Sequence, residues 1–272
     1  MNRPARVRRH SLIVRLSHWL AVPVIAILMG TGFNIFNAHP FLYWGAKGSS
    51  TDTADRWLAI GAVPDGEGGR RGLVVIGTSS FETTGLLGVS SNAKGRPVEQ
   101  AYPGWATLPA WRDLGLARNW HFAAAWGLAL IGFVYLGHGL ATGHIIGGLV
   151  PRRSDLAPRN LMKDVRGHLR LAKGRVELRY KPLQKLAYTG VILLILPLLM
   201  LSGLGMSPGM DAAWPWIVDL FGGRQSARSV HWLMAQALLL FVAVHLLMLL
   251  LAGPWRLLKP MLTGWQATGR TP

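Results

Sequence analysis

Two histidines lie fourteen residues apart in the apolar stretch RSVHWLMAQALLLFVAVH, at positions His231 and His245. On an ideal α-helix, fourteen residues rise about 21 Å and make almost four turns, so the two imidazoles project from nearly the same face. Ionisable side chains in membrane helices are costly, and they usually face the bundle interior, where they pair, bind or conduct. The spacing therefore predicts two functional levels on one helix, one near each membrane surface.

Two further histidines lie in segments of the same form, Arg-x-x-His-aromatic, which places an arginine one helical turn from a histidine. The three segments with this form are RLSHW, RNWHF and RSVHW. His18 is expected at the cytoplasmic depth of His245, and His121 at the periplasmic depth of His231. The sequence therefore predicts two histidine pairs, one in each leaflet.

Two facing imidazoles in an apolar bundle suit six-coordinate haem b, whose iron takes a neutral imidazole on each axial side. Its propionates seek cations near water, and an arginine can bind a carboxylate with two hydrogen bonds. Arg15, Arg118 and Arg228 are the expected propionate partners; ordinary interfacial charges are the alternative interpretation of all three. Cysteine is absent, which excludes disulfides, iron–sulfur clusters ligated by this chain and covalently attached haem.

The composition indicates a membrane protein. Half of the 272 residues are hydrophobic and only 15% are charged, whereas about a quarter are charged in a typical soluble domain. Four stretches reach the roughly 20 residues that a helix needs to cross a bilayer. They are residues 16–36, 120–143, 183–205 and 230–252. The predicted fold is an all-α, integral membrane four-helix bundle.

The distribution of Lys and Arg predicts the orientation. The N-terminal tail to Arg15 has five basic and no acidic residues, and segment 149–182 has ten basic against three acidic ones. The other two connections are balanced, with seven against seven and two against two. The positive-inside rule therefore places both termini in the cytoplasm, in a bacterial inner membrane, and segment 38–117 in the periplasm.

The connections divide the chain further. Segment 38–117, about 80 residues long, is expected to form a small folded cap with a β-like run, GLVVIG, since long loops without function are uncommon. A tolerated surface insertion is the alternative. For the basic segment 149–182 we expect anionic membrane lipids, and not nucleic acid, as partners. The predicted order is 1–37 tail and helix, 38–117 cap, 118–148 helix, 149–182 basic loop, 183–205 helix, 206–229 interfacial helix, and 230–272 helix and tail.

Other histidines offer alternatives. His138 lies at a depth near the inner pair but about 100° off the face of His121, and it could replace His18 as a ligand. His138 and His144 are also candidates for quinone or proton contacts near the cytoplasmic face. The remaining histidines, His10, His39 and His168, are interpreted as surface residues. Pro197 is expected to kink the third helix.

The segments RLSHW and RNWHFAAAW, with the fourteen-residue spacing in the last helix, resemble the di-haem cytochrome b subunits of bacterial nickel–iron hydrogenase, formate dehydrogenase and thiosulfate reductase, relatives of b-561-type cytochromes. The resemblance covers all four helices. It implies two haems b, with His18 and His245 on the inner one and His121 and His231 on the outer one. It also implies electron transfer between quinone or quinol and a partner enzyme.

The chain departs from that family in its long first loop and in lacking a fifth helix. The loop and the absence of cysteine resemble variants that serve periplasmic molybdopterin oxidoreductases. We therefore expect a di-haem cytochrome that links the quinone pool to a periplasmic redox subunit. The alternatives are a stand-alone quinone-linked oxidoreductase acting on a small species such as superoxide, and a histidine-lined proton or metal transporter.

Overall fold

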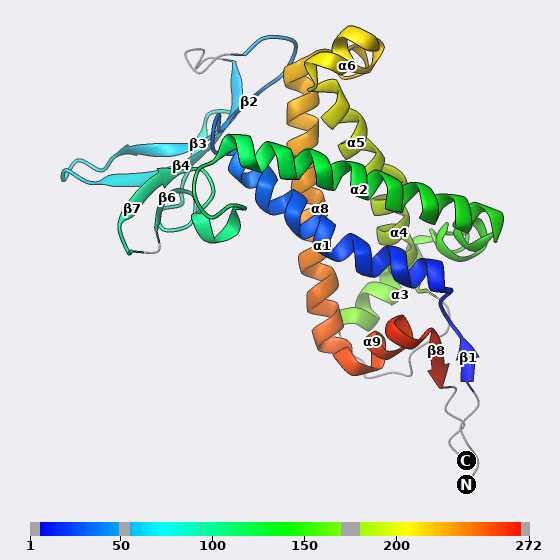
Figure 1. The fold of residues 1–272 in the computed structure, drawn as a ribbon. Helices are drawn as coiled ribbons and strands as arrows, with labels where there is room; N and C mark the ends of the chain where they lie inside the picture. The colour runs from blue at the N-terminus through cyan, green and yellow to red at the C-terminus, as the bar shows by residue number, and fades with distance from the viewer. Residues whose placement is uncertain (1–5, 49–54, 93, 170–179, 268–272) are drawn as a thin grey trace. The chain divides into compact units, whose positions relative to one another are not determined.

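The computed structural model describes residues 6–48, 55–92, 94–169 and 180–267. Within these residues, four helical segments are long and apolar enough to cross a membrane, which confirms the four predicted spans (Figure 1). They are α1 (Leu12–Phe36), α2 (Leu114–Ala141), a composite segment from Pro182 to Gly205, and α8 (Arg224–Ala252). Both α2 and α8 begin earlier than the predicted positions 120 and 230.

Large apolar side chains on these helices point outward. Phe133 is 78% exposed and Trp126 69% exposed on α2, and Leu240 and Leu250 are each 66% exposed on α8. Faces of this kind would be unfavourable in water, because each large apolar side chain loses about 1.5–3 kcal/mol when it is not removed from solvent. Lipid is therefore the solvent that matches the outer surface of the helices.

The composite third span contains a π-helical turn, η3 (Val191–Ile195), between α4 (Pro182–Gly190) and α5 (Leu196–Gly205). Pro197 has no backbone N–H to donate, and its ring crowds the preceding turn. A π-helical turn next to such a residue is a common way to absorb the misfit. The structure thus shows a helical irregularity directly before Pro197, where the sequence predicted a kink.

The chain divides into two compact units. The first unit contains residues 1–22, 129–197 and 236–272, and the second contains residues 23–128 and 198–235. His18 and His245 therefore belong to the first unit, and His121 and His231 to the second. Each predicted pair therefore lies within one unit.

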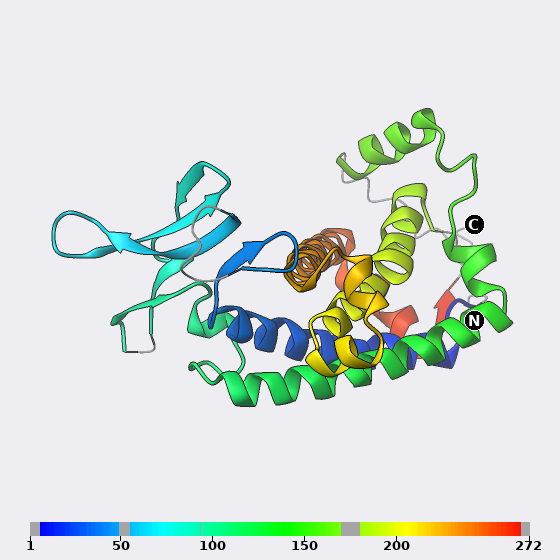
Figure 2. The same ribbon diagram turned by 90° about the horizontal axis from the view of Figure 1, so that it is seen from above.

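The segment between α1 and α2 is folded and belongs to the second unit. Its four-stranded antiparallel sheet runs in the order β2 (Phe41–Tyr43), β3 (Arg56–Pro64), β4 (Arg70–Ile76) and β5 (Ser79–Glu82) (Figure 2). A separate hairpin follows, β6 (Gly88–Ser91) with β7 (Pro97–Gln100), and then the 3₁₀ turn η1 (Gly104–Ala106). The run GLVVIG falls on β4 and the turn after it. The all-α class therefore applies only to the helical part of the chain.

This β region packs on the ends of α1 and α8. Leu42, Leu58 and Ile60 are buried together with Phe36 of α1, and Trp232 of α8 packs against the same cluster. Two hydrogen bonds join the region to the first turns of α8. The Trp57 indole N–H donates to Ser229 Oγ at 2.9 Å, and Ser229 Oγ donates to the Tyr43 carbonyl at 2.6 Å.

Replacing the buried Asn37 with alanine is expected to destabilise the β region by about 1–3 kcal/mol, at about 0.5–1.5 kcal/mol for each of two lost hydrogen bonds. The Asn37 amide donates to the Tyr102 carbonyl at 3.0 Å and accepts the Tyr102 N–H at 2.7 Å. Limited proteolysis in detergent should show faster cleavage within residues 55–92. The control is Asn92→Ala, which removes two hydrogen bonds in an exposed turn. Equal cleavage rates for the two variants would contradict the prediction.

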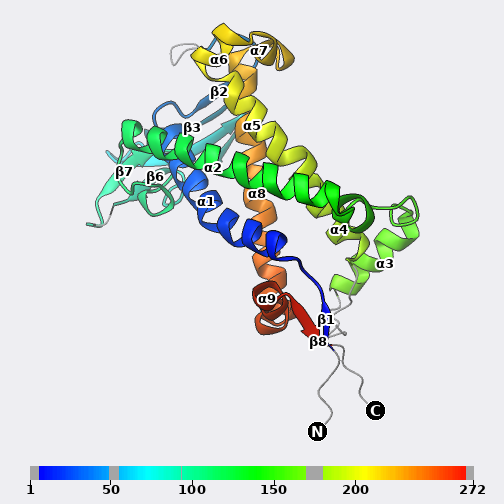
Figure 3. The same cartoon turned by 45° about the vertical axis from the view of Figure 1, so that its right-hand side comes forward.

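The two short helices after α5 replace the single interfacial helix expected in segment 206–229. They are α6 (Pro208–Ala213) and α7 (Trp216–Leu220), with a break at Trp214 and Pro215 (Figure 3). Proline at a helix start fits its missing N–H and fixed φ, and a proline ends the helix before it. Trp214 and Trp216 are 55% and 58% exposed, and their position at headgroup level stays a prediction.

Candidate functional site

The first unit brings His18 of α1 and His245 of α8 together. Their ring centroids lie 6.4 Å apart, with an interplanar angle of 58°. Phe241, one turn before His245, stacks on the His245 ring at 5.8 Å and 20°. Nδ1 of His18 is buried and has no hydrogen-bond partner among the described residues. This pair is therefore held mainly by apolar packing.

The second unit brings His121 of α2 and His231 of α8 together, with ring centroids 6.2 Å apart and an interplanar angle of 61°. Both rings are hydrogen-bonded at Nδ1. The Thr31 hydroxyl lies 3.0 Å from Nδ1 of His121, and the Ser202 hydroxyl lies 3.1 Å from Nδ1 of His231. Nδ1 of His231 also lies 3.0 Å from the carbonyl oxygen of Leu199. This pair is therefore fixed by polar contacts.

Both spacings fit a metal held between two imidazoles. With metal–nitrogen bonds of about 2.0–2.1 Å and ring centroids about 1 Å behind the bonding nitrogens, two trans imidazoles would have centroids about 6 Å apart. Each pair supplies only two ligands. A haem would supply the remaining ligands of its iron, so the donor set of each pair fits haem b.

The alternative ligand His138 lies elsewhere in the first unit. Its Nε2 atom is 3.0 Å from the Ser11 hydroxyl, whereas the ring that faces His245 is that of His18. His144 packs edge-on against Tyr135 at 6.4 Å. Burial, and secondarily the charge of His138, lowers the pKa of His144. Both side chains lie near the end of α2 (Leu114–Ala141).

The three candidate arginines have different surroundings. Arg15 donates from Nε to the Met261 carbonyl at 3.3 Å and from its terminal nitrogen to the Leu262 carbonyl, near the end of α9 (Pro254–Thr263). Arg228 donates to the His39 carbonyl, and its guanidinium lies 5.9 Å from the Phe36 ring centroid. Arg118 lies 5.7 Å from the Phe122 ring centroid. A guanidinium has five N–H donors, so these contacts leave further donors on each side chain.

His10, interpreted from the sequence as a surface residue, is partly buried, and its Nδ1 has no partner among the described residues. Burial, and then the charges of Arg9 and His144, lower its pKa to about 4. It lies beside the pairing of β1 (Arg6–Arg8) with β8 (Trp265–Ala267), which Figure 3 shows side by side. The side chain of His168 lies outside the described residues.

The pairing of β1 with β8 is expected to weaken as the pH falls from about 6.5 to about 4. In this window the unfolded segment, with an ordinary histidine pKa of 6.5, binds a proton that folded His10 does not bind. Hydrogen exchange of the β1 and β8 amides, corrected for intrinsic rates, should therefore accelerate at pH 5 relative to pH 7. His10→Gln should remove this acceleration. An equal pH response in the variant would contradict the assignment to His10.

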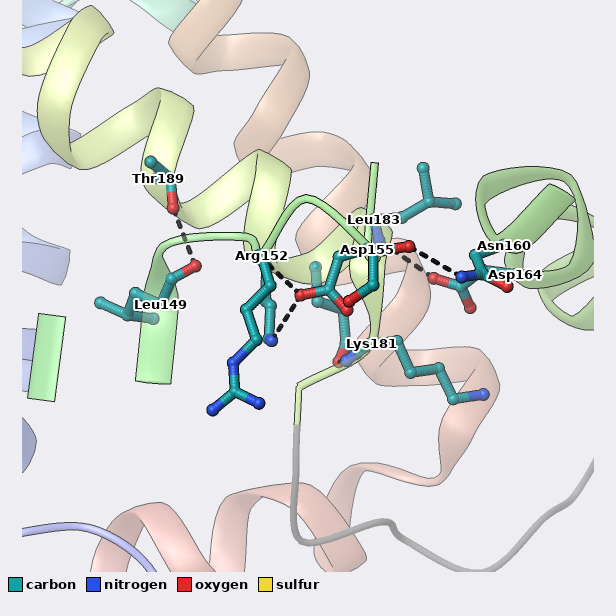
Figure 4. Close-up of polar contacts among 11 residues, drawn as sticks. Leu149, Arg152, Asp155, Asn160, Asp164, Lys181, Leu183 and Thr189 are labelled. Carbon is teal, nitrogen blue, oxygen red and sulfur yellow. Dashed lines mark hydrogen bonds and ion pairs between the residues drawn. The ribbon is translucent and has the colours of Figure 1, made fainter. Parts of the chain in front are cut away.

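The basic loop is held to the start of α4 by two of its acidic residues (Figure 4). The Lys185 ammonium pairs with the Asp155 carboxylate at 2.8 Å, and the Asp164 carboxylate of α3 (Pro158–Leu169) accepts the Leu183 N–H at 3.0 Å. The Lys185 hydrogen bond lowers the pKa of Asp155. These contacts leave most of the basic side chains of the described part of this loop for other partners.

Thr31 and Ser202 were not recognised from the sequence, although a signal existed. Both follow the same pattern, Leu-Met-x-Thr/Ser-Gly, at residues 28–32 and 199–203. Each hydroxyl bonds back to the carbonyl four residues earlier in its own helix, Ile27 at 2.6 Å and Leu198 at 2.5 Å. A repeated polar residue in two apolar helices indicates a shared task.

Comparison with known proteins agrees with this geometry. The family model for prokaryotic cytochrome b561 matches residues 9–264. The chain is also 27% identical, over 243 residues, to a putative protein-methionine-sulfoxide reductase subunit, YedZ1, of Azospira oryzae; the match covers 89% of this chain and 90% of that protein. No solved structure matches the chain. The chain belongs to the prokaryotic cytochrome b561 family, whose members are membrane proteins that bind haem b.

Proposed function

We propose that this chain binds two haems b and passes electrons across the bilayer between the quinone pool and a redox enzyme on the periplasmic side. The observation that carries the proposal is the placement of two histidines on α8, each facing a histidine of another helix at just over 6 Å. Imidazole pairs at two levels of one helix are what a two-step electron path requires.

Each pair has one task in this proposal. His18 and His245 hold the inner haem, and His121 and His231 hold the outer one, through neutral ring nitrogens. When bound, haem b supplies a one-electron Fe(III)/Fe(II) couple. Arg15, Arg118 and Arg228 offer N–H donors for propionate carboxylates. Apolar side chains beside the pairs, such as Phe241 stacked on His245, would limit the access of water to the bound group.

The partner is proposed to be an oxidoreductase subunit of the molybdopterin type. The relative from Azospira oryzae is named as a subunit of a protein-methionine-sulfoxide reductase. Reduction of a methionine sulfoxide to a thioether consumes two electrons and two protons and releases water, and oxidation of one quinol releases two electrons and two protons. The β region, packed on the ends of α1 and α8 next to His231, offers a docking surface for this subunit.

The membrane arrangement is also proposed. The surplus of Lys and Arg in the N-terminal tail and in segment 149–182 supports an inner-membrane protein with both termini in the cytoplasm. Anionic lipid headgroups fit the basic loop. His138, bonded to Ser11, and His144 offer exchangeable protons in the first unit, which supports a quinone or proton contact near the inner haem.

Purification of the tagged chain from its own cells in mild detergent tests this function. We expect a soluble oxidoreductase subunit to copurify, and quinol added to the complex to drive reduction of a methionine sulfoxide substrate. Omission of the soluble subunit should stop turnover while quinol still reduces haem. Turnover of superoxide by the chain and quinol alone would favour a stand-alone oxidoreductase, and a colourless protein that binds metal ions tightly would favour a transporter.

A further inference from the structure

Thr31 and Ser202 make equivalent contacts with the two paired histidines of the second unit, His121 and His231. Both side chains are buried, at 1% and 0% exposure. Each belongs to a helix that carries no histidine of that pair, Thr31 to α1 and Ser202 to α5. The contacts therefore come from two different helices and meet His121 and His231 at the same ring atom, Nδ1.

The hydrogen bonds around each hydroxyl fix the direction of donation. A hydroxyl has one proton to donate. Thr31 Oγ1 donates it to the Ile27 carbonyl at 2.6 Å, and the Leu28 carbonyl lies 3.2 Å away. Ser202 Oγ donates its proton to the Leu198 carbonyl at 2.5 Å, and the Leu199 carbonyl lies 3.3 Å away. Toward the histidine, each oxygen is therefore the acceptor, and Nδ1 carries the hydrogen.

The tautomer follows from this direction. A neutral imidazole with its hydrogen on Nδ1 has its lone pair on Nε2. The carbonyl of Leu199, 3.0 Å from Nδ1 of His231, supports the same tautomer, because a carbonyl can only accept. The two rings of this pair are thus prepared to bind a metal through Nε2.

We infer that Thr31 and Ser202 are positioning residues of the haem site formed by His121 and His231, each orienting its histidine and making it a stronger electron donor to iron. This inference rests on the proposed function. A hydrogen-bond acceptor on the outer nitrogen of a metal-bound histidine raises the basicity of the ligand. A more basic ligand stabilises Fe(III) and lowers the midpoint potential.

The first unit supplies an internal comparison. Nδ1 of His18 is buried without a hydrogen-bond partner among the described residues, so the pair of His18 with His245 lacks this contact at one ligand. Removal of the hydroxyls should therefore change one haem and leave the other unchanged. General loosening of the protein would change both.

The test uses the full-length protein with its haems bound, carrying Thr31→Val and Ser202→Ala together. We expect the reduction equilibrium constant of the His121–His231 haem to increase by up to tenfold. For a one-electron couple, this corresponds to a rise of about 59 mV in its midpoint potential. We also expect about tenfold faster loss of this haem to apomyoglobin. The His231→Ala variant identifies which spectral component belongs to this haem.

Two sets of control variants separate positioning from packing. Thr31→Ser with Ser202→Thr keeps both hydroxyls and should restore the wild-type potential. Thr189→Val removes a hydroxyl of α4 that donates to the Leu149 carbonyl at 3.0 Å and contacts neither pair, and it should change neither potential. Where the double variant does not accumulate, Ser202→Ala alone carries the test, with a smaller shift expected.

Three results would overturn the inference. They are an unchanged potential and haem loss rate in a double variant that holds two haems, an equal shift of both haems, and failure of the hydroxyl-retaining variant to restore the wild-type values. In each case the proposed function would stand. Wild-type protein without haem would instead refute the proposed function itself.

Discussion

The His231→Ala variant is expected to lose one haem and keep the other, and the His245→Ala variant is expected to lose the opposite one. Each substitution removes one of two axial ligands, and the two histidines face different partners, His121 and His18. Pyridine haemochrome quantification per chain should fall from two haems to one in both variants. Their reduced spectra should differ and should add up to the wild-type spectrum.

His138→Ala is the matched control for these variants. His138 is a histidine in a membrane-spanning helix of the same chain, but it bonds to Ser11 and not to another imidazole. We expect the control to retain both haems. Loss of a haem in this control would show that His138, and not His18, ligates the inner iron, and retention of both haems in His231→Ala and His245→Ala would refute the pairing.

Electron transfer across the membrane is expected to stop in each single-haem variant. His231 and His245 are separated by a rise of about 21 Å along α8, so a chain with one haem leaves one half of the path without a cofactor. Vesicles with oriented protein, quinol on the inside and impermeant ferricyanide outside should show ferricyanide reduction with wild type. The rate with either variant should fall to that of vesicles without protein.

The His138→Ala control should keep two haems per chain. Any change in its rate of ferricyanide reduction therefore reports on quinone or proton contacts of His138. A wild-type rate in His245→Ala vesicles would remove the inner haem from the path. A wild-type rate in His231→Ala vesicles would do the same for the outer haem.

The membrane-spanning helices were predictable because their signals are local. Length and apolar composition are sufficient to locate a helix in lipid, and the four predicted spans correspond to α1, α2, the segment from Pro182 to Gly205, and α8. The pairing of the four histidines also followed from helix geometry, since depth and face can be calculated from spacing along one helix. Orientation in the membrane and ligation of iron stay predictions.

The β region was harder to predict, because its order depends on contacts between distant residues. The GLVVIG run indicated a strand, but glycine-rich strands show little alternation of polar and apolar residues. The pairing of β4 with both β3 and β5 is not encoded in any single strand. The burial of Tyr43 and Tyr102 against helix ends likewise depends on tertiary packing.

The roles of individual polar groups were the least predictable. The sequence indicated Arg15 and Arg228 as propionate partners. The structure shows that both also donate to backbone carbonyls, which the sequence did not indicate, and their contact with a propionate stays a prediction. Thr31 and Ser202 remained unnoticed because a hydroxyl in an apolar helix usually bonds to its own backbone. Only the positions of neighbouring helices show that each hydroxyl also reaches a histidine.

Haem content of the purified wild-type protein tests the central claim most directly. The measurement combines pyridine haemochrome quantification with a dithionite-reduced minus oxidised spectrum of the protein in detergent. The proposed function predicts sharp haem b bands and two haems for each chain, with no haem covalently attached after acid–acetone extraction. Iron-free protein, or one haem per chain that survives equally in the His231→Ala and His245→Ala variants, would contradict it.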